Sequence, residues 1–374
     1  MRVLVCPDSF TGTLSASEAA AAIAEGWQHT AATDEITLMP LSDGGPGFAD
    51  AMATALSGTV YALEAMNLES TPTVSHWVRV GDTAYIESAS VIGMHLVTTS
   101  TIWQRTSFGV GELICAAIDS GCKKIVVGLG GTGTNDAGLG ALVALGAKVL
   151  NDADDDISLK VKSGPEHFSE ISRVDLSAAL VRVSTVDIEV ATDVDNPLLG
   201  LRGASHEYAP QKGAHQSDVI QLEAVLHKVS SVIGRRADGK DPAVALGAGA
   251  AGGLGFGLLA LGATRTSGID RILDALALDH VLRNVDLVVT GEGHFDWQSL
   301  RGKVIAGVSR RAMQVGCPVI VVAGQLSLTR RDWGDIGVSA AYSVVEFAGF
   351  DASMNEPYAA LRDTAARLAR TWSH

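Results

Sequence analysis

Cysteine is scarce in this 374-residue sequence, and none of its four cysteines has a partner at a recognisable spacing. There is no C-x-x-C motif among Cys6, Cys115, Cys122 and Cys317, and the ten histidines form no H-x-x-x-H motif. The spacings that usually hold zinc are therefore missing. Thiols without partners are typical of a reducing compartment, so we expect a cytoplasmic protein with buried or inert cysteines.

Positive charge is also in short supply, since 28 Lys and Arg face 42 Asp and Glu and the formal net charge is −14. Basic residues cluster only as isolated pairs such as Arg235–Arg236. Contact with a nucleic-acid backbone needs a concentration of cations, so nucleic acid is not an expected partner. A membrane is not expected either, because the long uncharged run at 242–264 holds seven glycines. Such a composition favours a glycine turn followed by a buried helix.

Three familiar catalytic motifs are absent as well. A Walker A box would need a glycine upstream of Gly302-Lys303, at the position that Trp297 occupies. The sequence also has neither the protein-kinase signatures nor a G-x-S-x-G elbow. A P-loop enzyme, a protein kinase and a serine hydrolase are therefore not indicated.

The most informative stretch runs from residue 123 to 145, KKIVVGLGGTGTNDAGLGALVAL. Its β-branched run at 125–127 predicts a buried strand, and the glycines that follow predict a turn. Strand, glycine turn, polar cap and helix is the arrangement by which α/β proteins offer backbone N–H groups to an anion. The alternative is a tight turn with close helix packing. The G-x-G-x-x-G spacing inside the stretch, typical of nicotinamide enzymes, also recurs at 247–252 and is a weak signal. The polar cluster exceeds what a helix cap needs and favours a ligand site; it consists of Thr132, Thr134, Asn135 and Asp136.

Strands and helices alternate at both ends of the chain. Buried strands are predicted at 3–6 and 36–41, and a capping box at 15–18 predicts the start of the first helix. A β-α-β unit is predicted at 287–323, whereas 60–88 has the spacing of shorter, hairpin-like strands. The pattern predicts an α/β fold with two domains: a Rossmann-like parallel sheet domain of residues 1–64 and 286–374, and a second, inserted α/β domain of residues 65–285.

Five predicted strand ends carry a carboxylate or a lysine beside glycine or other turn residues. They lie at Asp8, at Asp43, at 130–136, at Asp193 with Asp195, and at 291–296. In an extended chain Asp193 and Asp195 point to the same side, about 7 Å apart. Glycine loops for phosphates, carboxylates for Mg²⁺ and an Asp to take a hydroxyl proton are the parts that phosphoryl transfer needs. The alternative for each carboxylate alone is a helix or turn cap.

Seven segments, in order and over nearly the whole chain, resemble motifs of the bacterial glycerate kinase family of the glycerate 2-kinase type. They are PDSFTGTLSASEAAAAIAEGW, PLSDGGPG, GVGELI, GLGGTGTNDAGLGALVALGA, ATDVDNPLLG, PQKGA and VVTGEGHFDWQSLRGK. The resemblance implies a two-domain α/β kinase that moves the γ-phosphoryl group of ATP to a hydroxyl of D-glycerate, with Mg²⁺, to give 2-phosphoglycerate. It also implies three departures, because the family usually has Lys at Thr11, Glu at Pro46 and Arg-Ile at His294-Phe295.

Geometry and motif together suggest a role for each candidate residue, in a site expected in the cleft between the two domains. Asp193 is the expected base, with Asp8 and Asp43 as alternatives, and Lys212 is expected to face the substrate carboxylate or the γ-phosphate. Metal ligands are expected at Asp195 and Asp296. ATP is expected to contact Gly130, Gly131, Thr132, Thr134, Asn135, Gly291, Glu292, Gly293 and Lys303. The substrate is expected to contact Ser9, Asp43, Gly44, Asn196 and His294.

Two other functions stay open for the same residues. The first is a kinase for a related small hydroxy acid, or for the 3-hydroxyl of glycerate. The second is a nucleotide- or acid-binding protein of the same fold with impaired catalysis, suggested by the missing cations at Thr11 and His294. The expected partner in every case is a small molecule, and a homo-oligomer is possible.

Overall fold

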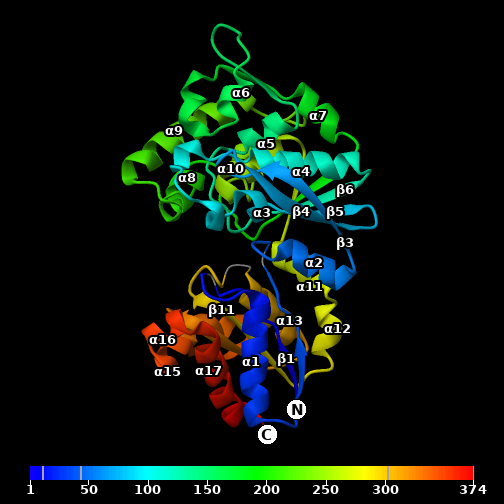
Figure 1. The fold of residues 1–374 in the computed structure, drawn as a ribbon, viewed down its shortest axis with the longest axis vertical. Helices are drawn as coiled ribbons and strands as arrows, with labels where there is room; N and C mark the ends of the chain where they lie inside the picture. Colours follow the sequence, from blue (N-terminus) through cyan, green and yellow to red (C-terminus); the bar gives the residue numbers. More distant parts are fainter. Residues whose placement is uncertain (11, 43, 301–302, 374) are drawn as a thin grey trace. The chain divides into compact units, whose positions relative to one another are not determined.

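The computed structural model describes residues 1–374 apart from residues 11, 43, 301–302 and 374 (Figure 1). The chain forms two compact units. The first comprises Met1–Asp43 and Gly268–His374, and the second comprises Gly44–Ser267. Compared with the predicted domains, residues 44–64 belong to the second unit and residues 268–285 to the first.

The first unit is built on a five-stranded sheet in the order β13-β12-β11-β1-β2, and every neighbouring pair is parallel. The predicted α/β fold with parallel sheets is therefore confirmed. The strands are β1 (Arg2–Val5), β2 (Glu35–Leu38), β11 (Leu287–Phe295), β12 (Val319–Leu326) and β13 (Val338–Ser343). The helices are α1 (Ala16–Thr30), α11 (Gly268–Ala275), α12 (Leu278–Leu282), α13 (Val304–Gln314), α14 (Arg330–Trp333), α15 (Val344–Ala348), α16 (Phe350–Asn355) and α17 (Pro357–Trp372).

Helices α1 and α17 lie side by side on one face of this sheet (Figure 1). The predicted capping box is present, because the Ser15 side chain accepts the Glu18 N–H and the Glu18 carboxylate accepts the Ser15 N–H. Gly26 of α1 lies so close to α17 that an added Cβ would fall 1.9 Å from the carbonyl oxygen of Arg362. A glycine is thus needed where the two helices touch.

The second unit is built on a six-stranded sheet in the order β10-β9-β6-β5-β4-β3. The strands from β10 to β5 are parallel, and the hairpin-like spacing at 60–88 corresponds to antiparallel neighbours. The strands are β3 (Thr59–Met66), β4 (Pro72–Val80), β5 (Thr83–Glu87), β6 (Lys124–Gly128), β9 (Asp187–Ala191) and β10 (Thr264–Thr266), with β7 (Lys148–Leu150) and β8 (Arg173–Asp175) as a separate pair. The helices are α2 (Phe48–Leu56), α3 (Ala89–Ile92), α4 (Phe108–Asp119), α5 (Leu139–Ala144), α6 (Ser158–Val161), α7 (Ser177–Val183), α8 (Ala204–Tyr208), α9 (Gln216–Ile233) and α10 (Ala250–Ala260).

The uncharged run contains a glycine turn and a buried helix, as predicted. Every residue of α10 is buried, and Ala251, Gly252 and Gly253 at its start have positive φ. A Cβ on Gly252 would fall 1.9 Å from the carbonyl oxygen of Thr134, so the glycine lets this turn pack against the stretch at 123–145. Within the described part of the chain, no helix combines the length and the apolar character needed to cross a membrane.

One predicted strand end is wrong. The run that starts at Leu287 was expected to end at Thr290 and to turn through the following glycines, but β11 continues to Phe295. Gly291 and Glu292 pair with Val322 and Ala323 of β12. The neighbouring strand, which is distant in sequence, supplies these partners, and the absence of a side chain on Gly291 permits the close approach.

Candidate active site

The glycine loop after β6, residues 129–133, is packed into the second unit on most sides. A Cβ on Gly130 would fall 2.5 Å from the Cα of Gly45, which shows how closely the two backbones approach. The loop is exposed at Gly131 and partly at Gly130, whereas its other residues are buried. Several of its N–H groups donate to carbonyl oxygens of the same unit: Leu129 to Ala191 at 3.1 Å, Gly130 to Gly44 at 3.1 Å and Gly133 to Ile92 at 2.7 Å.

The polar residues that follow the loop, Thr134, Asn135 and Asp136, are buried and hydrogen-bonded within the unit, apart from Oδ1 of Asn135, which is buried without a partner among the described residues. Thr134 donates through Oγ1 to the carbonyl oxygen of Ala251 at 3.3 Å, and Asn135 donates through Nδ2 to the Ser205 hydroxyl at 3.2 Å. Both side chains are fully buried. As placed here, they hold the loop against the rest of the unit.

Asp136 is the most heavily bonded member of this cluster. Its carboxylate accepts the N–H and the hydroxyl of Ser107, both at 2.8 Å, and the N–H groups of Gly138 at 3.0 Å and Gly140 at 3.3 Å. Burial raises the pKa of Asp136, although these hydrogen bonds act in the opposite direction. The predicted strand, glycine turn and helix are present, with a short helix, α5 (Leu139–Ala144), and the Asp136 carboxylate accepts N–H groups at its start.

Lys212 is buried beneath the same loop, with 4% of its surface exposed. Its Nζ donates to the carbonyl oxygen of Thr134 at 2.7 Å, and Arg105 donates to the carbonyl oxygen of Lys212 at 2.8 Å. Burial lowers the pKa of Lys212 to about 7, with Asp136 acting against the decrease and Arg105 adding to it. In this conformation the ammonium group supports the backbone of the glycine loop.

The predicted pair of carboxylates lies just after β9, beside the end of β10. The Ser267 hydroxyl donates to Oδ1 of Asp193 at 2.7 Å, and Arg265 forms an ion pair with Oδ1 of Asp195 at 2.7 Å. Asp193 is half-buried and Asp195 exposed. The next residue, Asn196, donates to the carbonyl oxygen of Arg202 at 2.7 Å and accepts the Tyr208 hydroxyl at 2.8 Å.

A second group of candidate residues lies in the first unit, where the chain leaves β1 and β11 continues beside it. The Asp8 N–H donates to the carbonyl oxygen of Gly291 at 2.8 Å, and the Ser9 N–H donates to Oδ1 of Asp8 at 2.6 Å. Glu292 is buried at 8% exposure, and Gly293 follows it in the strand. Asp8, Ser9 and Glu292 therefore share the carboxyl edge of a parallel sheet, where such sheets usually bind ligands.

The segment after Gly293 carries the remaining candidates of this unit. His294 is exposed, and its Nε2 lies 2.6 Å from the Ser327 hydroxyl. The Asp296 carboxylate accepts the Gln298 N–H at 2.8 Å, as in an Asx turn. Lys303 occupies the position before α13. Asp43 and Thr11 lie outside the described residues.

No group of three or more His, Cys, Asp or Glu side chains is arranged to hold a metal ion within the described ranges. A metal that arrives with a nucleotide needs only one or two protein carboxylates, since phosphate oxygens and waters complete its shell. The carboxylates present fit that kind of site better than a preformed protein cage.

Comparison with known proteins identifies the family. The model of the glycerate kinase family matches residues 3–373. This chain belongs to the glycerate kinase family. The resemblance inferred from the seven motifs and the prediction of a kinase are thereby confirmed.

Relatives and a solved structure agree with this family over almost their full lengths. A glycerate kinase from Halalkalibacterium halodurans is 34% identical over 98% of this chain and 97% of the relative. A glycerate 2-kinase from Escherichia coli is 36% identical over 99% of this chain and 96% of the relative. A crystal structure from Salmonella typhimurium LT2, assigned as a glycerate kinase 2, has a TM-score of 0.77 and 35% identity, and the match covers 99% of this chain and 98% of that one.

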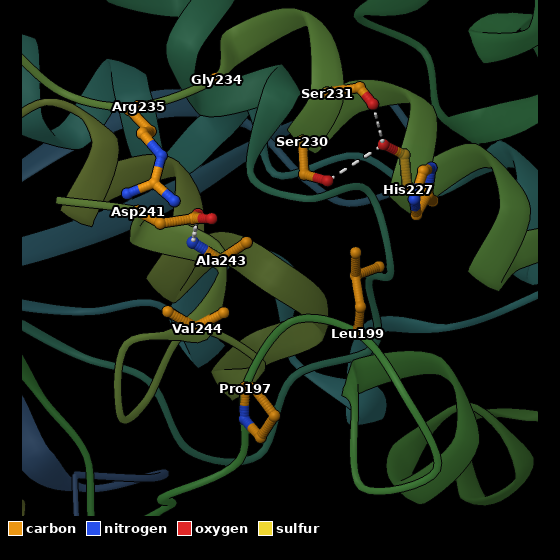
Figure 2. Close-up of a pocket in the computed structure, with 10 residues that line it drawn as sticks. All are labelled: Pro197, Leu199, His227, Ser230, Ser231, Gly234, Arg235, Asp241, Ala243 and Val244. Carbon is orange, nitrogen blue, oxygen red and sulfur yellow. Dashed lines mark hydrogen bonds between the residues drawn. The ribbon is translucent and has the colours of Figure 1, made fainter. Parts of the chain in front are cut away.

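A pocket of about 640 Å³ lies elsewhere in the second unit of this kinase, at the carboxyl end of α9 (Figure 2). Figure 2 shows Arg235 and Asp241 on one side of it and His227 of α9 on the other. Among its lining residues, Pro197 is next in sequence to a predicted site residue, Asn196. None of the predicted site residues is among its lining residues.

Glu87 is a carboxylate of this site region that the sequence analysis missed. It ends β5 opposite Gly128 of β6, and its Oε2 accepts the N–H groups of Gly47 at 2.9 Å and Ala49 at 3.3 Å. Burial raises its pKa to about 7, and the neighbouring Asp50 adds to the increase. The sequence signal that marks Asp8 and Asp193, a carboxylate at the end of a predicted strand, is also present at Glu87.

Glu87→Gln is expected to flatten the pH dependence of stability between about pH 4.5 and 7. The folded protein keeps this proton up to about pH 7, whereas the unfolded chain loses it near pH 4.5. The folded state thus binds more protons in this window, and wild-type stability falls as the pH rises. Relative to the variant, the wild type should lose about 2 kcal/mol of unfolding free energy, because partial exposure of the carboxyl screens part of the effect.

Urea unfolding at a series of pH values measures this difference. Glu207→Gln is the matched control, since Glu207 is an exposed glutamate of the same unit, and its curve should follow that of the wild type. Parallel curves for the wild type and Glu87→Gln would contradict the role given to this proton.

Proposed function

We propose that this member of the glycerate kinase family transfers the γ-phosphoryl group of ATP to a hydroxyl of D-glycerate, giving 2-phosphoglycerate and ADP. The observation that carries the proposal is the segment from Asp193 to Asn196, held after β9 beside the glycine loop in a chain that matches the family throughout. The name of the Escherichia coli relative, glycerate 2-kinase, favours the 2-hydroxyl over the 3-hydroxyl.

Asp193 is the proposed base. Its half-buried carboxylate is held by the Ser267 hydroxyl, and one Asp that accepts the hydroxyl proton is the protein group that phosphoryl transfer typically requires. Asp195 is less suited to this task because the guanidinium of Arg265 compensates its negative charge. Asp8, in the first unit, is the rival, and Asp43 stays a candidate outside the described residues.

The phosphates of ATP are proposed to approach the glycine loop at Gly130 and Gly131, its exposed part. Thr132, Thr134, Asn135 and Lys212 support this loop from inside the unit, so we assign them to its shape rather than to direct contact. Pro46, one of the departures from the family motifs, lies against the loop at Gly131, since a Cβ on Gly131 would fall 2.7 Å from its Cδ.

The first unit supplies the other proposed contacts. Asp8, Ser9 and Glu292 lie at one sheet edge, and Gly291 and Gly293 keep the backbone there free of side chains. In the first unit, His294 is proposed to face the substrate carboxylate, Lys303 to face the nucleotide and Asp296 to bind Mg²⁺. In the second unit, Asn196 and Gly44 are proposed substrate contacts, and Asp195 is a proposed Mg²⁺ ligand.

ADP release from Mg-ATP and D-glycerate is the direct test, with the product identified by phosphorus NMR. We expect turnover of about 1–100 s⁻¹, the ordinary range for kinases, and a 2-phosphoglycerate resonance. Reactions without acid, with L-glycerate and with a panel of other small hydroxy acids are the controls. Faster turnover of another acid would move the proposal to that substrate, and a 3-phosphoglycerate product would correct the position.

A binding protein with impaired catalysis is the second candidate. It is favoured by His294, an imidazole bonded to Ser327 where the family usually has arginine. Calorimetry that detects tight ATP binding, in a protein that releases no ADP with any acid of the panel, would replace the kinase with this function.

A further inference from the structure

The two carboxylates after β9 are both held by side chains of the neighbouring strand. Thr266 at the end of β10 pairs with Ala191 at the end of β9, and the Thr192 N–H donates to the Thr266 carbonyl oxygen at 3.0 Å. Past the end of β9, Asp193 accepts the Ser267 hydroxyl and Asp195 forms its ion pair with Arg265. The parallel register, which places Ala191 opposite Thr266, brings Asp193 near Ser267, whereas the ion pair of Asp195 reaches back to Arg265 inside β10.

The two contacts differ in the charge of the group that meets the carboxylate. The ion pair compensates the charge of Asp195 with a guanidinium. The Ser267 hydroxyl is neutral, and its bond to Oδ1 fixes the orientation of Asp193. The bond from Ser267 occupies one of the roughly four acceptor sites of the Asp193 carboxylate.

We propose that Ser267 is a positioning residue for phosphoryl transfer, which acts by orienting the Asp193 carboxylate toward the substrate hydroxyl. The proposal rests on the function proposed above, in which Asp193 is the base. A general base must lie within hydrogen-bond reach of the proton that it takes, and misplacement by about 1 Å lowers the rate steeply. The bond from Ser267 supplies that restraint without contact between Ser267 and the substrate.

Ser267→Ala tests the proposal in the full-length protein. We expect kcat to fall by about 10- to 100-fold, while KM for ATP changes by less than about twofold. Ser267→Thr keeps a hydroxyl and should restore most of the rate.

Thr264→Ala is the matched control, since it removes a hydroxyl from an exposed residue of β10, the strand that Ser267 follows, and should leave kcat unchanged. A double-mutant cycle separates positioning from general damage. In the Asp193→Asn background, Ser267→Ala should cause no further loss, because the group that it orients no longer works as a base.

Each other outcome has a defined meaning. Normal kcat in Ser267→Ala, or an equal loss in both backgrounds, would overturn the positioning role and leave the kinase function standing. Full activity in Asp193→Asn would overturn the assignment of the base and this proposal with it. Absence of turnover by the wild-type protein with every hydroxy acid of the panel would overturn the proposed function itself. The wild-type assay comes first, so this outcome is known before any variant is made.

Discussion

Asp193→Asn is expected to lower kcat by about 10²- to 10⁴-fold, the usual contribution of a general base, with KM for ATP changed by less than about threefold. The amide is nearly the same size as the carboxylate and keeps an oxygen that can accept the Ser267 hydroxyl. The local structure should therefore persist while the ability to take a proton is lost. Steady-state kinetics with Mg-ATP and D-glycerate give both constants.

The same substitution at three other positions decides between rival bases. Asp8→Asn in the first unit and Asp43→Asn test the alternatives directly. Asp195→Asn is the closest comparison, because Asp195 follows the same strand but is held in an ion pair with Arg265. Retention of most of kcat in Asp193→Asn, with a large loss in one of the others, would transfer the role to that residue. ATP binding measured by calorimetry on each variant shows whether the nucleotide site is intact.

Local sequence patterns predicted much of the fold. The capping box at Ser15 and Glu18 marks the start of α1, and the β-branched run at 125–127 lies within β6. Such features depend on residues within one or two turns of each other, so they can be seen in the sequence. The βα alternation then indicates parallel sheets, because parallel strands need crossover connections.

The distribution of elements between the two units depended on contacts that are distant in sequence. Helix α2 follows β2 in the chain, yet it belongs to the second unit, where the rings of Phe48 and Tyr85 lie 6.2 Å apart. At the other end, Gly307 of α13 packs against Ile269 of α11, which places α11 in the first unit. The predicted domain boundaries relied on a change in strand spacing along the sequence, which contains no information about these two contacts.

The candidate site shows the same division. The sequence located the strand ends with their carboxylates, because those residues follow apolar runs directly. It could not show that Thr134 and Asn135 turn inward, since their partners, Ala251 and Ser205, come from segments about 70 or more residues away. The sequence also could not show that Gly291 and Glu292 pair with β12 and so extend β11. Polar residues near glycines look alike in sequence whether they bind a ligand or the rest of the fold.

Asp136→Ala is expected to lower the unfolding free energy by about 3 kcal/mol, the largest effect on stability predicted for this chain. The change removes the acceptor of the Ser107 N–H and hydroxyl and of the Gly138 and Gly140 N–H groups, all buried. Each buried donor left without an acceptor costs about 1–3 kcal/mol. The expected loss is smaller than the sum of these separate costs. Burial raises the pKa of Asp136, which shows that desolvation destabilises its charge, and this destabilisation is absent in the variant.

Urea unfolding measures the free energy, and hydrogen exchange of peptides covering 107–111 and 136–145 locates the change. Asp156→Ala is the matched control, since Asp156 is an exposed aspartate of the same unit that accepts one backbone N–H, from Ser158 at 2.9 Å, and its loss should be much smaller. Faster exchange confined to the two peptides would show that Asp136 ties the start of α4 to the start of α5. Equal stability of the two variants would mean that water replaces the carboxylate, and that Lys212 and Thr134 hold the glycine loop without it.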